Sequence, residues 1–260
     1  MPFAYNGDVR IHYLVEGAGP PLVLHHGYSD SVETWYDYSY VTGLANRHRL
    51  LLLDARGHGA SDKPHDPARY SPVDMVGDVI AVLDDCGAQR ADFYGHSMGG
   101  GLGLCMARLR PDRLRSLITT GASPLYDTSD GDDGQAPLLF PDMTAEQLVA
   151  AWESQSTISP QLRSRILAND MVALSALMKN SDPVPVENLL TELSLPFLLL
   201  AGELDEIYPA LAEYSAQLPA EAFVTLPGLT HLQSFQRSDL VVPIVQSFLD
   251  GLIHTGVLDG

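Results

Sequence analysis

Short apolar runs alternate with stripes of helical periodicity along most of this chain. Runs that suit strands buried on both faces of a parallel sheet lie at residues 22–26, 50–54, 91–94, 114–120, 196–201 and 222–226. Between the second and third runs, apolar residues repeat at helical spacing from Val73 to Leu83. Ser71 and Pro72 supply the cap and the first-turn residue of that helix. The alternation predicts a doubly wound α/β sheet.

The first residues of the chain predict an antiparallel pair of strands. Asn6-Gly7 is a two-residue hairpin signal between apolar segments at 3–5 and 9–15. At the other end, a last helix is predicted at 240–253.

The rhythm changes in the middle of the chain. A loop rich in Gly, Ser and Asp is followed by helical segments predicted near 144–154 and 160–179. Thr144 begins the first of them with the pattern of a capping box. We interpret residues 123–190 as a helical cap inserted into a core formed by residues 1–122 and 191–260.

Composition and charge exclude several classes of partner. The 260 residues are 45% hydrophobic, enough for one domain with a substantial core. Fifteen basic and 33 acidic residues give a net charge of −18, which repels nucleic acid and anionic membranes. The chain has no apolar run long enough to span a bilayer, and residues 1–8 do not read as a secretory signal. We expect a cytoplasmic monomer or homodimer that binds neither nucleic acid nor a membrane.

The two cysteines, Cys86 and Cys105, are expected to be buried thiols rather than a disulfide. No Cys-x-x-Cys pair or His/Cys cluster indicates a metal. We expect no metal and no organic cofactor.

The segment Gly95-His96-Ser97-Met98-Gly99 is the most informative motif. It has the pattern G-x-S-x-G, follows the predicted strand at 91–94 and precedes small, helix-forming residues from Gly100 to Ala107. A strand, a sharp turn and a helix with serine at the apex form a nucleophile elbow. Side chains at Gly95 and Gly99 would collide with the neighbouring strand and helix. Ser97 is therefore the predicted nucleophile.

A serine hydroxyl needs a base to take its proton. His231 lies after the predicted strand at 222–226, in a loop expected at the same sheet edge as the elbow. His96 adjoins Ser97, but its side chain is expected to point away. The other histidines have weaker cases: His25 and His26 end a strand as packing or pocket residues, His254 is in the final helix, and the rest are His12, His48, His58 and His65.

The base needs a carboxylate to fix its tautomer. Asp205 is the predicted partner, because its loop leaves the strand that ends at Ala201; Glu203 and Glu206 are rivals. The order Ser97, Asp205, His231 is that of an α/β sheet with a nucleophile elbow.

Two backbone amides are predicted to stabilise the oxyanion. Met98 follows the nucleophile at a helix N-terminus, and Tyr28 follows the strand end at His26-Gly27, where Gly27 permits a tight bend. The substrate-binding residues are expected to be apolar: Trp35, Phe140, Trp152 and Leu232, with Tyr28, Tyr36, Met98, Leu125 and Phe235 as further candidates.

These motifs together resemble the α/β-hydrolase superfamily. The matching segments, spread in order over nearly the whole chain, are His26-Gly27, 54–62, 95–100, 111–117, 202–205 and His231. The resemblance implies a mostly parallel sheet of about eight strands, a cap after the sixth strand, and the triad proposed above. In similar proteins the 54–62 segment is a structural scaffold beneath the active site.

The predicted activity is hydrolysis of a small ester, lactone or thioester through an acyl-enzyme, with a neutral or apolar acyl substrate. Ser97 disfavours dehalogenases and epoxide hydrolases, which use aspartate. Residues 28–31 and Leu232 depart from the pattern of C–C bond hydrolases, which remain an alternative. A cofactor-free perhydrolase or haloperoxidase and a hydrolase-like receptor for a small molecule are further alternatives. Leu104 breaks the glycine spacing of a dinucleotide-binding loop.

Overall fold

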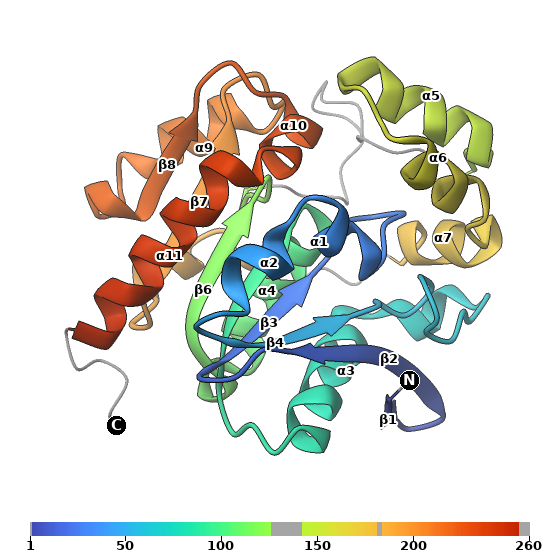
Figure 1. Cartoon of the computed structure of the whole chain (residues 1–260), viewed down its shortest axis with the longest axis horizontal. Helices are drawn as coiled ribbons and strands as arrows, with labels where there is room; N and C mark the ends of the chain where they lie inside the picture. The colour runs from blue at the N-terminus through green and yellow to red at the C-terminus, as the bar shows by residue number, and fades with distance from the viewer. Residues whose placement is uncertain (1, 126–141, 181–183, 255–260) are drawn as a thin grey trace.

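Eight strands form one sheet in the computed structural model, which describes residues 2–125, 142–180 and 184–254 (Figure 1). The strands are β1 (Phe3–Asn6), β2 (Val9–Glu16), β3 (Pro21–His25), β4 (Arg49–Leu53), β5 (Ala91–His96), β6 (Leu114–Thr120), β7 (Phe197–Gly202) and β8 (Phe223–Leu226). Their order across the sheet is β1-β2-β4-β3-β5-β6-β7-β8. Strands β3 to β8 run parallel, and β2 is antiparallel to both of its neighbours. The predicted mostly parallel α/β sheet is confirmed.

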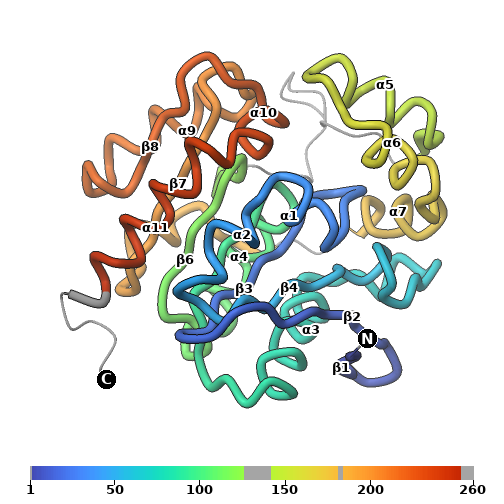
Figure 2. Tube along the Cα trace, viewed as in Figure 1, coloured from blue at the N-terminus to red at the C-terminus, as the bar shows by residue number. Residues whose placement is uncertain are grey.

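The β1–β2 hairpin differs by one residue from its prediction. Asn6 pairs with Val9, so the two loop residues are Gly7 and Asp8. The Asn6 side chain donates hydrogen bonds to the Asp74 carbonyl and to Asp78 Oδ1, which holds Asn6 in the strand instead of the turn. Figure 2 follows the chain from this hairpin, at one edge of the sheet, to β8 at the other.

Two hydrophobic cores lie on opposite faces of the sheet, because successive side chains of a strand point to opposite sides. Val23, Phe93 and Leu199 face one core, and their neighbours Leu24, Tyr94 and Leu200 face the other. The first core is closed by α3 (Pro72–Asp85), α4 (Met98–Leu109), α8 (Leu189–Glu192) and α9 (Tyr208–Ser215). The second is closed by α1 (Glu33–Asp37), α2 (Tyr40–Leu44), α10 (His231–Gln236) and α11 (Ser238–His254).

Three further helices form a group beside the sheet: α5 (Ala145–Gln155), α6 (Pro160–Leu167) and α7 (Met171–Met178) (Figure 1). They pack on one another and on Tyr28 and Leu232 in a third apolar cluster. The segment predicted as one helix at 160–179 is two helices, because Asp170 accepts hydrogen bonds from the first amides of α7 and so begins a new helix. The domain limits at 123 and 190 remain a prediction.

Three short 3-10 helices complete the described elements: Pro67–Tyr70, Pro111–Arg113 and Ala220–Ala222. Among the residues that the structure describes, no helix is both long and apolar enough to cross a membrane. Cys86 and Cys105 are free, partly buried thiols, as expected.

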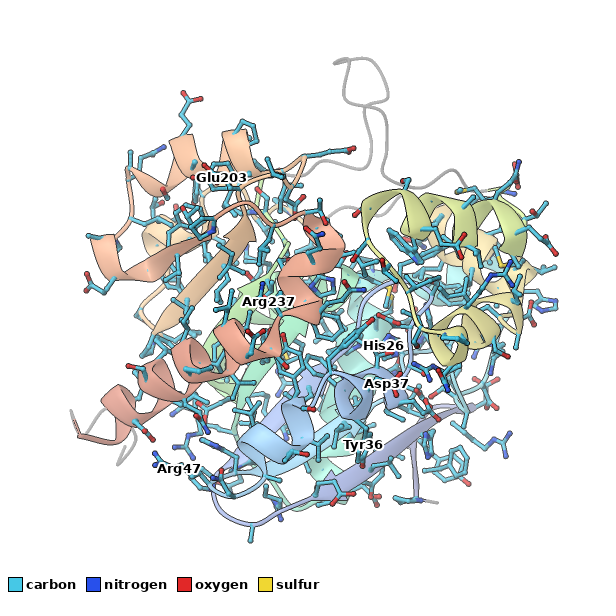
Figure 3. All side chains as sticks on the ribbon, turned by 45° about the horizontal axis from the view of Figure 1, so that its top comes forward. His26, Tyr36, Asp37, Arg47, Glu203 and Arg237 are labelled. Atoms are coloured by element: carbon cyan, nitrogen blue, oxygen red, sulfur yellow. The ribbon has the colours of Figure 1, made fainter. Side chains whose placement is uncertain are left out.

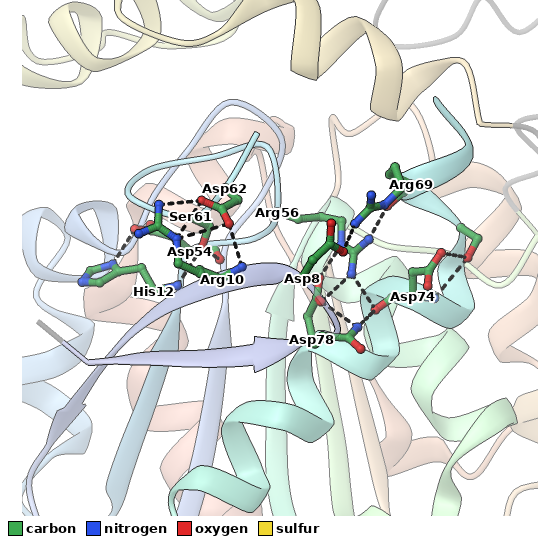
Figure 4. Close-up of polar contacts among 12 residues, drawn as sticks. Asp8, Arg10, His12, Asp54, Arg56, Ser61, Asp62, Arg69, Asp74 and Asp78 are labelled. Atoms are coloured by element: carbon green, nitrogen blue, oxygen red, sulfur yellow. Dashed lines mark hydrogen bonds and ion pairs between the residues drawn. The ribbon is translucent and has the colours of Figure 1, made fainter. Parts of the chain in front are cut away.

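Buried charges hold the segment 54–62 in place (Figure 4). Asp54 accepts hydrogen bonds from the Val32 and Ala60 amides and lies 2.7 Å from His12 Nδ1. Arg56 donates through Nε and Nη2 to both carboxylate oxygens of Asp78, at 2.6 and 2.5 Å. These contacts tie the segment to β2, α1 and α3, which fits the structural role expected of it.

Candidate active site

Ser97 occupies the sharp turn between β5 and α4. Its φ of 53° and ψ of −117° lie in a region that non-glycine residues rarely adopt. The turn brings backbones into close approach: a Cβ at Gly95 would lie 2.2 Å from the Gly99 carbonyl oxygen, and one at Gly99 would lie 2.2 Å from the His25 carbonyl oxygen. The strand–turn–helix geometry predicted from G-x-S-x-G is therefore present.

Ser97, His231 and Asp205 form one chain of hydrogen bonds. The Ser97 hydroxyl lies 2.8 Å from His231 Nε2, and His231 Nδ1 lies 2.7 Å from Asp205 Oδ2. His231 and Asp205 are 4% and 3% exposed, so bulk water does not compete for these contacts. With Nδ1–H donating to the carboxylate, Nε2 is left to accept the serine proton.

Each partner of the serine is fixed by its local structure. Asp205 follows β7 in a turn closed by its own amide on the Gly202 carbonyl, and its Oδ1 accepts from the Ile207 amide. The rivals Glu203 and Glu206 are exposed, and Glu203 instead accepts from the Gly228 amide. Only Asp205 of the three candidates contacts the histidine.

His231 is the first residue of α10, not a loop residue as predicted. Thr230 caps that helix by accepting from the Gln233 amide, and the Thr230 amide donates to Gln233 Oε1, which completes a capping box. The pattern Thr-x-x-Gln at 230–233 was the available sequence signal for this helix start. The two hydrogen bonds between Thr230 and Gln233 fix the first turn of α10, and this turn orients the imidazole of His231.

The two predicted oxyanion donors flank the serine. Met98 is the first residue of α4, where an amide has no partner within the helix. Tyr28 follows Gly27. A Cβ added at Gly27 would lie 3.4 Å from Ser97 Cβ, so the glycine lets the two segments approach each other, although its φ is not positive. Within the described ranges, neither amide donates to another protein group. Both are available to a ligand oxygen.

A cavity opens in front of the serine hydroxyl. Its lining residues come from the loop after β3, from the elbow, from α5 and α6, and from α10: Gly27, Tyr28, Asp30, His96, Ser97, Trp152, Leu162, His231 and Leu232. Trp152 and Leu232 thus line the cavity, and their role in substrate binding stays a prediction. Phe140 lies outside the described residues. Tyr36 is on the surface, where its hydroxyl donates to Glu16.

Trp35 does not line the cavity, so its prediction as a substrate-binding residue is wrong. Its ring is fully buried between α1 and the sheet, edge-on to Phe235 at 4.9 Å and to Tyr40 at 5.1 Å. Tyr94 of β5 closes the same aromatic cluster. The large apolar ring gains more from this core than from an open pocket.

The side chain of His96 was expected to point away from Ser97, and this expectation is wrong, because His96 lines the same cavity as Ser97. The centroid of its ring lies 5.1 Å from that of His231, the predicted base. The ring also stacks on Phe235, with 4.3 Å between the two centroids. Burial holds the pKa of His96 well below its ordinary value, so a neutral ring faces the imidazolium that His231 would become. The period of two along β5, which puts His96 on the same face as Tyr94, could have revealed this.

Two buried histidines support the loop that carries Tyr28 and Ser29. His58 Nε2 accepts from the Ser29 amide at 3.1 Å, and His26 Nε2 accepts from the Ala55 amide at 3.0 Å. Burial lowers the pKa of both, and the pKa of His58 falls to about 3. Figure 3 shows His26 in the interior of the molecule.

Ser29 also receives bonds from the α5–α7 helices. Trp152 Nε1 donates to Ser29 Oγ at 3.0 Å, and Asn169 Nδ2 donates to the Ser29 carbonyl at 2.8 Å. With a φ of 65°, Ser29 forms the bend of the loop. The loop beside the nucleophile is therefore anchored both to the buried His58 and to the helices above it.

Comparison with known proteins agrees with this geometry. The family model described as alpha/beta hydrolase fold matches residues 20–145. A Bacillus subtilis protein provisionally named as a 2-succinyl-6-hydroxy-2,4-cyclohexadiene-1-carboxylate synthase is 27% identical over 93% of this chain and 96% of its own length. The pimeloyl-[acyl-carrier protein] methyl ester esterase of Aeromonas hydrophila is 29% identical over 90% of this chain and 96% of its own.

A solved structure of a hydrolase from Pseudomonas aeruginosa superposes with a TM-score of 0.81. It is 25% identical and covers 95% of this chain and 97% of its own. The chain therefore has the α/β-hydrolase fold, and its sequence matches the model of that family over residues 20–145.

Proposed function

We propose that the protein is a serine hydrolase that cleaves a small carboxylic ester, lactone or thioester through an acyl-enzyme. The observation that carries the proposal is the chain of hydrogen bonds from Ser97 through His231 to Asp205, opening into a cavity beside two unpaired amides. The Aeromonas relative, named as a methyl ester esterase, supports ester chemistry.

In the first half-reaction, His231 Nε2 takes the hydroxyl proton as Ser97 Oγ attacks the carbonyl carbon of the substrate. Asp205 holds Nδ1–H and stabilises the imidazolium that results. The carbonyl oxygen becomes an oxyanion, to which the amides of Tyr28 and Met98 donate. The N-terminal dipole of α4 adds to that stabilisation.

The first half-reaction ends when the tetrahedral intermediate collapses to the acyl-enzyme and His231 gives its proton to the leaving alcohol or thiol. In the second half-reaction, water attacks the acyl-enzyme while His231 takes one of its protons. The second collapse releases the carboxylic acid and restores the Ser97 hydroxyl. No step in this sequence requires a group from outside the protein other than substrate and water.

The cavity walls support a substrate with an apolar acyl part. Tyr28, Trp152, Leu162 and Leu232 present aromatic and aliphatic surface beside the serine. Such surface favours hydrocarbon over charged groups by burial alone. We also propose that the protein is cytoplasmic, which its free thiols support.

The test is the Ser97→Ala variant. We expect kcat/KM for p-nitrophenyl acetate to fall by roughly 10⁴–10⁶ while thermal unfolding is unchanged. An organophosphonate should label Ser97 in the parent protein and label nothing in the variant.

Ser39→Ala is the matched control, because Ser39 also has a positive φ (62°) but lies before α2, away from the cavity. It should keep the parent activity. Substantial esterase activity in Ser97→Ala would refute the proposal. Repeated turnovers by the parent protein distinguish an enzyme from a receptor, which would show a single burst.

A further inference from the structure

One carboxyl group lies in the catalytic cavity without a part in the proposed reaction. Asp30 lines the cavity together with Ser97, two residues after the oxyanion donor Tyr28. Its amide donates to the Gly27 carbonyl, and its Oδ1 accepts from the Thr34 hydroxyl at 2.9 Å. These bonds fix the position of the carboxyl group but involve only one of its two oxygens.

Asp30 Oδ2 accepts no hydrogen bond from any residue in the described ranges. The guanidinium of Arg165 acts on Asp30 electrostatically, but it is held in an ion pair by Asp37. Burial raises the pKa of Asp30 to about 7. Asp30 as a whole is partly exposed, and a carboxylate that is partly withdrawn from water gains from a ligand that brings a donor to its free oxygen.

The surroundings of Asp30 set it apart within the cavity. Apart from the catalytic pair and the neutral His96, the other side chains that line the wall are those of Tyr28, Trp152, Leu162 and Leu232. A single acidic group on an apolar wall is the arrangement by which pockets fix the orientation of a ligand. The net charge of −18 also raises the local concentration of cations over anions.

We propose that Asp30 is a specificity-determining residue that binds a protonated amine on the acyl part of the substrate. The inference rests on the proposed function, since it places the amine in the cavity that holds the reacting carbonyl. The substrate class is therefore an ester, lactone or thioester whose largely apolar acyl chain carries a basic nitrogen. Oδ2 accepts the N–H bond and Oδ1 keeps its bond with Thr34.

The test compares esters that differ only in the amine. The p-nitrophenyl esters of β-alanine and ε-aminohexanoic acid are paired with the butyrate and heptanoate esters of the same length. Assays at about pH 8 keep the carboxyl group ionised, since that pH is above its pKa. The measured quantity is the ratio of kcat/KM for each amino ester to that of its alkyl partner, in the parent and in Asp30→Asn.

We expect Asp30→Asn to lower this ratio by about tenfold for at least one pair, because a hydrogen bond to a charged group is lost. Asn keeps the size of Asp and an acceptor for Thr34. Glu33→Gln is the matched control, since it removes one negative charge from an exposed position three residues away. That variant should leave the ratio within about twofold of the parent.

An equal loss for both members of each pair would show that Asp30 only supports the loop, and the inference would fall while Ser97-dependent hydrolysis stood. Loss of the ratio in Glu33→Gln to the same extent would replace the local contact with a general field effect. If Ser97-dependent hydrolysis of neither ester type is found, the proposed function falls first.

A measurement on the unsubstituted protein guards against poor folding of the variant. Butylammonium should inhibit hydrolysis of p-nitrophenyl butyrate at a concentration about tenfold lower than butanol does. Equal inhibition by the two compounds would contradict a cation-binding role for Asp30.

Discussion

Substituting Gly121 by alanine tests whether the position of the imidazole controls the reaction. Gly121 follows β6 with a φ of +66°, and a Cβ there would lie 2.9 Å from His231 Cε1 and 3.0 Å from His231 Nδ1. Gly228 has nearly the same φ, +67°, but a Cβ there would meet no atom within 4 Å. The two glycines therefore separate backbone strain from contact with the base.

Both Gly→Ala variants should lose about 1–2 kcal/mol of unfolding free energy, because alanine is strained at positive φ. At Gly121 the ring of His231 must also move by about half an ångström to restore an ordinary contact distance. Such a shift disturbs the short contacts of His231 with Asp205 and Ser97. We expect kcat/KM to fall by roughly 10–10²-fold in Gly121→Ala, and by no more than about twofold in Gly228→Ala.

The assay is steady-state hydrolysis of p-nitrophenyl acetate, with urea unfolding of both variants to measure the strain. The reasoning is refuted if the two variants lose activity equally, or if Gly121→Ala keeps the parent rate at the same loss of stability. Equal losses of activity would mean that backbone strain decides the outcome, and an unchanged rate in Gly121→Ala would mean that the added Cβ does not displace the imidazole.

Three further predictions concern buried ionisable side chains. Asp205→Asn should lower kcat by roughly 10⁴, because an amide beside His231 Nδ1 favours the wrong tautomer, and unchanged kcat would exclude Asp205 as the partner. Arg56→Met should lower the unfolding free energy in urea by about 3–5 kcal/mol, because Asp78 is left buried and unpaired, and Arg56→Met combined with Asp78→Leu should recover part of it. His58 has a pKa of about 3 in the folded protein against 6.5 ordinarily, so its neutral form contributes stability in full above about pH 6.5 and loses it as the pH falls toward 3. Urea unfolding at stepwise pH should show His58→Gln with a slope shallower than the parent's by about 1.4 kcal/mol per pH unit, and identical slopes would contradict a neutral His58.

Local patterns were enough to predict the sheet and the chain of contacts at its edge. The runs at 50–53 and 197–200 are buried on both faces, so any parallel sheet must contain them. The G-x-S-x-G turn is recognisable because only glycine permits the approach of backbones at Gly95 and Gly99. Asp205 and His231 could be chosen because the carboxyl ends of parallel strands meet at one edge.

The remaining features depend on long-range packing. The side to which Trp35 turns is set by Tyr94 and Phe235, which are distant in sequence, and a helix of five residues carries too little periodicity to show it. The hairpin register depends on a contact between Asn6 and α3. The break at Asp170 could have been read as a helix cap, but the apolar spacing on both sides concealed it.

Asp30 illustrates the same limit within the candidate site. In the sequence it is one of 33 acidic residues, with no motif to distinguish it. Its place in the cavity follows from the bend at Ser29 and from the arrival of Trp152 and Leu162 from remote helices. Chemistry that arises between distant segments has no signature in either segment alone.

Ser29 connects the loop beside the nucleophile to two separate parts of the structure. Its amide donates to the buried ring of His58. Its side chain and its carbonyl accept from Trp152 and Asn169, which belong to the α5–α7 region. The amide that would stabilise the developing charge belongs to the adjacent residue, Tyr28. Substitutions in α5–α7 that admit another substrate therefore also move the Tyr28 amide. Selectivity and rate in this protein change together.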